Sequence, residues 1–300
     1  MTCTNTKLRT IICDSRNYEN FDLSDVTEAN NVVIANLIND FYDHFEFEQV
    51  EISKAKYITF VKLIQRSYLA NPYHNFNHAI DATITLAYLL NITNFKFGRI
   101  EKVALCLAML CHDVGHFGKT GSFVQKYCED ITSVCKSTSP LEEYHLNIFA
   151  DIVDKAGLFE DIDGDSIEYL NDIITKCIMS TDPATTTDFI KNGTDSHKLI
   201  IKCADIGSSL KSFKIHVKWA DRLMEEFFAQ GDDITEKGDV PMDLFDHTKI
   251  NKMPSNQIWF FENYAIPLFA KSTEFDDNDL LMCRLVDTRE RWRNRSMAWI

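Results

Sequence analysis

The chain has 300 residues, 45% of them hydrophobic, and a formal net charge of −14. This length fits one large domain or two small ones, and the apolar content is sufficient for a substantial core. The acidic balance and the lack of a basic cluster argue against nucleic acid or an anionic membrane surface as a partner.

Apolar residues recur at helical spacing along the chain, and no linker, repeat or low-complexity tract divides it. We expect one domain over residues 26–300, preceded by a loosely ordered start over 1–25. Ser24 and Asp25 are candidate caps of the first core helix, which carries Val32 and Phe41. The other expected helices cover 54–69, 80–89, 99–111, 145–157, 167–179, 197–210, 215–228 and 256–271. Together they predict an all-α fold, a compact multi-helix bundle with functional residues on facing sides.

The nine cysteines include no CxxC pair, which indicates reduced thiols and not a disulfide framework. The first residues, MTCTNTKLRTIIC, lack the apolar core of a signal peptide. The longest apolar run, 103–111, is about half as long as a membrane span requires. We therefore expect a cytoplasmic protein without a membrane span.

The strongest local signal is an HDxxH pattern, His112-Asp113-Val-Gly-His116, at the end of an apolar helix. Adjacent side chains leave a helix about 100° apart, so a helix end lets His112 and Asp113 reach one point. A following helical turn would bring His116 to the same side. Imidazole with carboxylate suits Zn²⁺, and carboxylate with water suits Mg²⁺ or Mn²⁺. The alternative is a helix end with polar caps and no metal ion.

Two weaker signals are an HNxxH pattern, with His74 and His78, and a late carboxylate, Asp205. Histidines four residues apart lie on one helical face, so one could bind metal while the other acts as an acid or base. Alternatively, the segment is a polar turn after Pro72. Asp205 follows apolar residues in a predicted helix, where a buried carboxylate is costly unless it is paired or bound to metal. The alternative for Asp205 is a solvent-facing position on the polar side of that helix.

In combination these patterns are far more specific than each alone. Over roughly residues 55–270 the chain resembles the catalytic domain of class I 3′,5′-cyclic nucleotide phosphodiesterases. The likeness continues in the family's order through 139–145 (SPLEEYH), 179–182 (MSTD), 219–227 (WADRLMEEF), 257–260 (QIWF) and 267–268 (PL). The resemblance implies a two-metal site of the HD type that hydrolyses cAMP, cGMP or both to the 5′-monophosphate.

The resemblance also implies a role for each matching residue. The tighter ion, usually taken as Zn²⁺, would be held by His78, His112, Asp113 and Asp205. Asp113 would also bridge to a second ion, usually Mg²⁺ with Mn²⁺ as a substitute. Water around the ions would be oriented by His116, Glu142, His145 and Thr181.

The implied reaction needs an acid. A hydroxide that bridges the two ions would attack phosphorus, and the leaving ribose 3′-oxygen is strongly basic. His74 would protonate this oxygen, since its reference pKa of about 6.5 suits proton transfer near neutral pH. Glu142 or another carboxylate would keep His74 protonated.

The resemblance further implies a purine pocket that includes Tyr73. Gln257 would hydrogen-bond the base edge, in one rotation for adenine and in the flipped one for guanine. Phe260 and Leu223 would lie on opposite faces of the ring. Taken alone, Phe260 is typical of a core aromatic residue and Gln257 of a surface amide. Ser208 stands where many members have Asn near the purine, which favours dual specificity.

One departure from the family pattern concerns the metals. Gly121 stands where the family has an Asn that orders metal-bound water, so we expect a second ion that binds more weakly; alternatively, glycine is needed there for a positive φ. Two rival functions stay open. Another HD-type nucleotide phosphohydrolase would explain HDxxH and Asp205 but not Gln257. A pseudoenzyme that binds cyclic nucleotide as a sensor is favoured by Gly121 alone. The sequence leaves the oligomeric state and the regulation open.

Overall fold

The computed structural model describes residues 7–25, 28–271 and 278–297, and this part of the chain is helical, without a β-strand. In chain order the α-helices are α1 (Leu8–Ile12), α2 (Ser15–Glu19), α3 (Glu28–His44), α4 (Lys54–Ser67), α5 (Phe76–Asn91), α6 (Arg99–Cys111), α7 (Gly121–Tyr127), α8 (Glu129–Thr132), α9 (Pro140–Ala156), α10 (Gly164–Ser180), α11 (Thr186–Asn192), α12 (Ser196–Asp205), α13 (Phe213–Glu236), α14 (Met253–Phe260), α15 (Ile266–Ala270) and α16 (Asn278–Met297). Four 3₁₀ turns, η2 (Phe47–Val50), η3 (Pro183–Thr185), η4 (Gly207–Leu210) and η5 (His247–Lys252), and a π-helical segment, η6 (Phe261–Ala265), complete the set. The predicted all-α bundle is confirmed.

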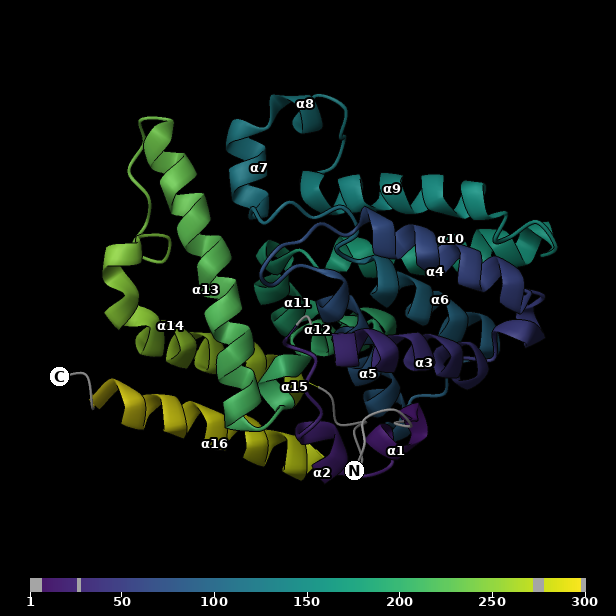
Figure 1. Cartoon of the computed structure of the whole chain (residues 1–300), viewed down its shortest axis with the longest axis horizontal. Helices are drawn as coiled ribbons and strands as arrows, with labels where there is room; N and C mark the ends of the chain where they lie inside the picture. The colour runs from purple at the N-terminus through teal and green to yellow at the C-terminus, as the bar shows by residue number, and fades with distance from the viewer. Residues whose placement is uncertain (1–6, 26–27, 272–277, 298–300) are drawn as a thin grey trace.

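The helices that carry the HNxxH and HDxxH patterns lie at the centre of the bundle. Every residue of α5 from Phe76 to Leu89 is buried, and so is every residue of α6 from Val103 to Cys111. A helix that is buried on all sides needs neighbours on all sides. Around α6 pack α5, α10 and α12, while α4 and α9 pair next to them, and α13, α14 and α16 lie on the other side of the molecule (Figure 1). The polar residues at the ends of α5, α6 and α12 are therefore held on a rigid frame.

The start of the chain differs from the loosely ordered segment that we predicted. Residues 8–19 form α1 and α2, and Leu8, Ile11 and Tyr18 are buried. The Tyr18 ring stacks on Tyr88 of α5 with centroids 4.1 Å apart. Apolar residues three and four apart give this short segment one face that reaches the core. The predicted boundary at 25/26 and the cap of the first core helix fall next to residues 26–27, which lie outside the described part.

The later helices follow the predicted ranges with differences at their ends. The helix predicted over 197–210 ends at Asp205, and η4 follows. A Cβ added at Gly207 would lie 2.3 Å from Thr85 Oγ1, so the turn comes close against α5. The helix predicted over 215–228 continues to Glu236, with Gln230 and Ile234 buried. The helix predicted over 256–271 is interrupted by η6, just before Pro267, which has no N–H to donate to the preceding turn.

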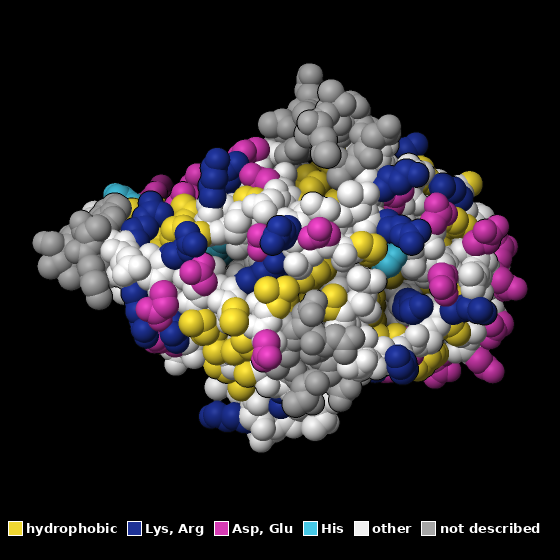
Figure 2. Space-filling model, turned by 90° about the horizontal axis from the view of Figure 1, so that it is seen from below, with side chains coloured by type: hydrophobic (Ala, Val, Ile, Leu, Met, Phe, Trp, Pro, Cys, Tyr) yellow, Lys and Arg dark blue, Asp and Glu magenta, His cyan; other side chains and the backbone are white. Residues whose placement is uncertain are grey.

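The surface carries both charges. On the face shown in Figure 2, Lys and Arg side chains are interspersed with Asp and Glu, and hydrophobic side chains lie between them. None of the described helices combines the length and the apolar character that crossing a bilayer requires.

Candidate active site

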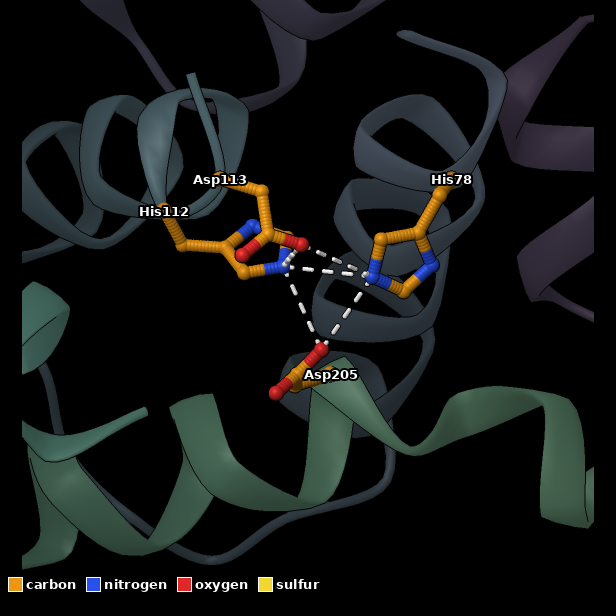
Figure 3. A group of neighbouring side chains, drawn as sticks. All are labelled: His78, His112, Asp113 and Asp205. Carbon is orange, nitrogen blue, oxygen red and sulfur yellow. Dashed lines mark hydrogen bonds and ion pairs between the residues drawn. The ribbon is translucent and has the colours of Figure 1, made fainter. Parts of the chain in front are cut away.

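Four side chains from three helices converge where α5, α6 and α12 meet (Figure 3). His78 projects from the first turn of α5, His112 and Asp113 follow the last turn of α6, and Asp205 is the last residue of α12. The Nε2 atoms of His78 and His112 are 3.2 Å apart, and each lies 3.2 Å from Asp205 Oδ1. Asp113 Oδ2 lies 3.1 Å from His112 Nε2 and 3.5 Å from His78 Nε2. We call these four residues the cage.

The cage has the dimensions of a metal site. Donor atoms at about 2.0–2.1 Å from one ion lie about 2.8–3.4 Å from one another in octahedral or tetrahedral arrangements, close to the distances above. The His112 Nδ1–H donates to Met109 O at 2.8 Å, which leaves Nε2 facing the other three residues, where its lone pair becomes available when Nε2 loses its proton. Two imidazoles with two carboxylates suit a borderline divalent cation such as Zn²⁺.

The protonation states of the cage residues also suit a cation site. Burial lowers the pKa of His112, but Asp113 and Asp205 outweigh burial and hold it well above its usual value. Burial raises the pKa of Asp205, but His112 and His78 outweigh burial and lower it below the usual range. Both carboxylates are therefore ionised, and a proton on His112 balances part of their charge. A cation that enters the cage displaces this proton, so its affinity falls as the pH falls.

His145 lies beside the cage and has an unused hydrogen-bonding atom. Its Nδ1–H donates to Val114 O at 2.8 Å, whereas its buried Nε2 has no hydrogen-bond partner and lies 4.0 Å from Asp113 Oδ1. Burial lowers the pKa of His145 to about 4, so the ring is neutral and Nε2 is an acceptor. His145 Nε2 and Asp113 Oδ1 both accept hydrogen bonds, and the 4.0 Å between them suits a group such as water that donates to both.

His116 reaches the same region by a different route from the one we predicted. Residues 112–116 do not form the helical turn that we predicted. They form a tighter turn in which the N–H of His116 donates to Asp113 O at 3.0 Å and Gly115 has φ 78°. Burial and the neighbouring His74 charge hold the pKa of His116 well below its usual value. One ring atom of His116 lies within 4.8 Å of ligand atoms of Asp113 and His145. The sequence thus predicted the location but not the backbone that creates it.

Glu142 and Thr181 line the cavity onto which the cage opens. Glu142 lies in the first turn of α9, where burial and the charges of Asp182 and Asp113 raise its pKa to about 8. The Thr181 hydroxyl donates to Ile178 O at 2.8 Å, so its oxygen remains free to accept a hydrogen bond.

His74 does not share a helical face with His78, because α5 begins at Phe76. Asn75 is the N-cap, and its side chain accepts from the N–H groups of Asn77 and His78. His74 therefore lies in the preceding loop, where its Nδ1 is 2.5 Å from Glu226 Oε2 on α13. Burial lowers the pKa of His74, but the charge and hydrogen bond of Glu226, helped by Asp113 and Asp205, raise it above its usual value.

Glu226 is a functional residue that the sequence analysis missed. It is buried, and its Oε1 also accepts from the backbone N–H groups of Tyr73 and His74, each at 2.7 Å. We expected Glu142 or an unspecified carboxylate in this role. A signal was present, because Glu226 lies three residues after Leu223 and so on the same face of α13.

His74, His116 and Glu226 also lie close enough together to suggest a second metal site, but their orientation argues against it. The rings of His74 and His116 are stacked, with centroids 3.9 Å apart and planes 22° apart. Imidazole lone pairs lie in the ring plane, so two stacked rings cannot direct them at one ion. His116 Nδ1 also accepts from Gly118 N at 3.0 Å. This group is suited to acid–base chemistry.

The cavity beside the cage has a volume of about 690 Å³. Its walls include the residues expected to bind substrate, namely Tyr73, Leu223, Gln257 and Phe260, together with His74, Asp113 and Asp205. The Phe260 ring stacks on Tyr264, with centroids 5.5 Å and planes 21° apart. A volume of this size suits a nucleotide-sized ligand, and it places a possible base pocket and the cage in one space.

His216 is a second wall residue that the sequence analysis missed. It lies on α13, its Nδ1–H donates to Ser208 O at 3.2 Å, and burial lowers its pKa to about 4. Its Nε2 is therefore a neutral acceptor. Gln257 lies close enough to raise the pKa of His216 slightly against the effect of burial, but the buried Nε2 of His216 makes no hydrogen bond in the structure.

Gly121 has an ordinary backbone. It is the first residue of α7, the glycines with positive φ are Gly115, Gly118, Gly157 and Gly238, and a Cβ added at Gly121 would meet nothing within 4 Å. The alternative that glycine is required here for a positive φ is wrong.

Comparison with known proteins gives independent evidence on the family to which the chain belongs. The cGMP-specific 3′,5′-cGMP phosphodiesterase 3 of Dictyostelium discoideum is 26% identical over 93% of this chain and 66% of the relative. The dual 3′,5′-cyclic-AMP and -GMP phosphodiesterase beta of Plasmodium falciparum is 29% identical over 75% of this chain and 22% of the relative. The chain thus spans less than two thirds of the length of these curated relatives. The phosphodiesterase domain of Salpingoeca rosetta rhodopsin phosphodiesterase shares the fold, with a TM-score of 0.84 at 20% identity, covering 99% of this chain and 96% of that one.

The sequence profile of 3′5′-cyclic nucleotide phosphodiesterases matches residues 73–283. This span contains the cage, His74, Glu226 and the walls of the cavity from Tyr73 to Tyr264. The chain therefore belongs to the 3′5′-cyclic nucleotide phosphodiesterase family.

Proposed function

We propose that this chain hydrolyses the cyclic phosphodiester of cAMP, cGMP or both to the 5′-monophosphate. The observation that carries the proposal is that the cage, the His74–Glu226 pair and Gln257 open onto one cavity. These are the parts that the reaction needs: a place for cations beside the phosphate, a proton donor for the leaving oxygen, and a polar group for the base edge. The two curated relatives above carry names that specify cGMP and both nucleotides, respectively.

We propose that the cage holds Zn²⁺ and that Asp113 shares a second ion, Mg²⁺ or Mn²⁺. Such a pair of ions, when bound, neutralises phosphate oxygens and supplies a nucleophile by lowering the pKa of water. The distances within the cage and the unpartnered His145 Nε2 beside Asp113 Oδ1 support this assignment. Asp113 is suited to bridging, because its Oδ2 faces the cage histidines and its Oδ1 faces His145.

The protein itself supplies the proton. Glu226 fixes Nδ1–H of His74 and stabilises the charged ring, so Nε2–H is left for donation. The 3′-alkoxide that leaves the phosphorus is strongly basic and takes this proton in or near the transition state. His74 then returns to its charged form by taking a proton from solvent, because 22% of its side chain is exposed.

His216 bears on the choice of base. A neutral acceptor at His216 Nε2 favours the rotation of Gln257 that turns the amide N–H₂ towards it, since the flipped amide would set two acceptors against each other. A fixed amide suits either adenine or guanine but not both. We therefore propose a preference for one purine, because the proximity of the unpartnered His216 Nε2 to Gln257 works against the dual specificity expected from Ser208.

An assay of the purified chain with cAMP, cGMP and a linear nucleotide diester, in Mg²⁺, Mn²⁺ and Zn²⁺, tests the function. We expect 5′-monophosphate from at least one cyclic nucleotide and no comparable turnover of the linear diester. Faster hydrolysis of the linear substrate would favour another HD-type phosphohydrolase. Binding of cyclic nucleotide without turnover in any of these metals would favour the sensor.

The base pocket gives a first prediction. Phe260→Ala should raise KM for the preferred nucleotide about 5- to 150-fold, because stacking on an aromatic ring contributes about 1–3 kcal/mol per base. The change in kcat should be small, since Phe260 is remote from the reacting phosphate. Phe260→Leu keeps apolar contact without stacking and should lie between the two. Steady-state kinetics check this, and a loss confined to kcat would contradict the placement of the base.

The second prediction concerns Gly121. Gly121→Asn should lower the Mg²⁺ concentration for half-maximal activity several-fold, because an amide at this position can order metal-bound water and the space for it is open. Gly164→Asn is a matched control, since Gly164 also begins a helix and a Cβ there also meets nothing within 4 Å. If the Mg²⁺ titration is the same in Gly121→Asn and in the control, Gly121 is unrelated to the second ion.

We also propose the cytoplasm as the compartment and a cyclic nucleotide as the small-molecule partner. The eight described cysteines are free thiols, and four of them, Cys106, Cys111, Cys177 and Cys203, are buried. Free thiols in this number suit a reducing environment.

A further inference from the structure

The acid loop, residues 71–75, and the turn that follows α6, residues 112–118, come from distant parts of the chain, and one side chain joins them. Asn71 Nδ2 donates to His74 O at 2.8 Å and to His116 O at 2.6 Å. An amide N–H₂ has two hydrogens, so both donors of Asn71 are used. The first bond closes the acid loop on itself, and the second fastens it to the turn.

The remaining hydrogen bonds of the acid loop lead elsewhere. Glu226 of α13 accepts from Tyr73 N and His74 N, and Arg222 of the same helix donates to Pro72 O at 3.5 Å. Asn75 Nδ2 donates to Asn71 O at 2.9 Å, within the loop. The hydrogen bond from Asn71 to His116 O is thus the polar link that runs from this loop directly to the turn after α6.

We propose that Asn71 is a positioning residue that fixes the acid, His74, relative to the cage. This rests on the proposed function of His74. The turn held by Asn71 begins with the cage residues His112 and Asp113 and includes His116, whose ring stacks on His74 with centroids 3.9 Å apart. Asn71 therefore fixes the distance and direction from the proton donor, His74, to the cage, beside which the phosphate is proposed to bind.

This distance and direction matter for the reaction rate. The proton must reach the leaving oxygen at hydrogen-bond distance while the phosphate lies at the cage. A misplacement of about 1 Å between reacting groups costs on the order of 10²-fold. Glu226 keeps His74 charged, but it ties the acid to α13 and not to the cage.

Asn71→Asp tests the proposal, because it keeps the shape and replaces the N–H₂ group, which donates to two carbonyl oxygens, by an acceptor oxygen that faces them. We expect kcat for the cyclic nucleotide to fall about 10- to 100-fold with KM changed less than about threefold. A nitrophenyl phosphodiester, whose leaving group needs no proton, should lose much less. Asn39→Asp is the matched control, because the exposed Asn39 on α3 also donates to a backbone oxygen, Ala35 O at 2.9 Å; it should leave both rates unchanged.

A double-mutant cycle separates positioning from general damage. In the His74→Ala background, Asn71→Asp should cause no further loss of cyclic nucleotide turnover, because the acid it positions is gone. A full additional loss, or an equal loss with both substrates, would overturn the proposal. If Asn71→Asp does not fold by circular dichroism, Asn71→Ala, which removes both donors without adding charge, is compared in its place.

A readout without turnover keeps this inference distinct from the proposed function. The proton between His74 Nδ1 and Glu226 Oε2, which are 2.5 Å apart, should give a low-field NMR signal in the substrate-free protein. Asn71→Asp should shift or broaden this signal, and Asn39→Asp should not. An unchanged signal would count against Asn71 as a positioning residue. Absence of cyclic nucleotide turnover in the unsubstituted chain would instead refute the proposed function.

Discussion

Asp113→Asn is expected to lower cyclic nucleotide turnover by about 10³-fold or more, the largest loss of any single substitution in the cage. Asp113 Oδ2 lies 3.1 Å from His112 Nε2, and Oδ1 faces His145 Nε2 at 4.0 Å. One carboxylate would therefore contact both the ion in the cage and the proposed second ion. The amide is isosteric but uncharged. Loss of charge stabilisation by two cations amounts to several kcal/mol, and each 1.36 kcal/mol is tenfold in rate.

The measurement pairs kcat in saturating Mg²⁺ or Mn²⁺ with the metal content of the dialysed protein by elemental analysis. The substituted protein should retain its helical circular dichroism and lose bound metal. Asp151→Asn, at an exposed position of α9 that pairs with Lys155, serves as control and should keep both metal and activity. Near-normal turnover in a folded, metal-free Asp113→Asn protein would rule out the two-metal hypothesis.

The cage could be predicted because each of its members leaves a local trace in the sequence. His112 and Asp113 follow the unbroken apolar stretch 103–111, and Asp205 follows a mainly apolar stretch that Lys202 interrupts. Carboxylates in such positions are unusual for a core helix. The local patterns do not show that α6 and α12 meet at α5. That the four residues lie together was expected only because their motifs occur in the order typical of the family. The four residues that the motifs pointed to do lie together in the structure, and their role as metal ligands stays a prediction.

Glu226 could not be predicted in the same way. Its contact with His74 spans 152 residues of sequence, and the spacing from Leu223 indicates a shared face of α13 but not which residue of the distant loop Glu226 meets there. Glu225 is exposed and Glu226 is buried, a difference that depends on how α13 is rotated against the acid loop. His216 and Asn71 were missed for the same reason, since their partners are a backbone carbonyl or a side chain on another element.

The prediction that His74 and His78 share a helix was wrong, although the sequence between them indicates where the helix begins. His74 and His78 are four residues apart, which led us to one helical face, but Asn75 between them is a strong N-cap residue. In the structure Asn75 has an extended backbone (φ −131°, ψ 178°) and ends the loop in which His74 lies. The helix start thus separates an acid on a loop from a ligand on a helix.

The second large effect is expected from Glu226→Gln. The amide keeps the shape but removes the negative charge that holds His74 in its protonated form. We expect kcat for the cyclic nucleotide to fall on the order of 10²-fold, towards the 10²–10⁴-fold that general acid catalysis contributes. Glu225→Gln, one residue away on the exposed side of α13, is the matched control and should leave kcat unchanged.

The pH profile decides whether the loss comes from the acid. His74 must be protonated to act, so activity is present below its pKa and is lost as the pH rises through it. Burial lowers this pKa and Glu226 is the largest of the effects that raise it; without the carboxylate, burial prevails and the pKa falls. The alkaline limb of kcat should therefore move to lower pH in Glu226→Gln, and the rate should recover in part as the pH is lowered. A nitrophenyl phosphodiester should show neither the shift nor the full loss. If the limb stays in place while kcat falls, Glu226 acts by holding the loop through Tyr73 N and His74 N, and the proton donor lies elsewhere.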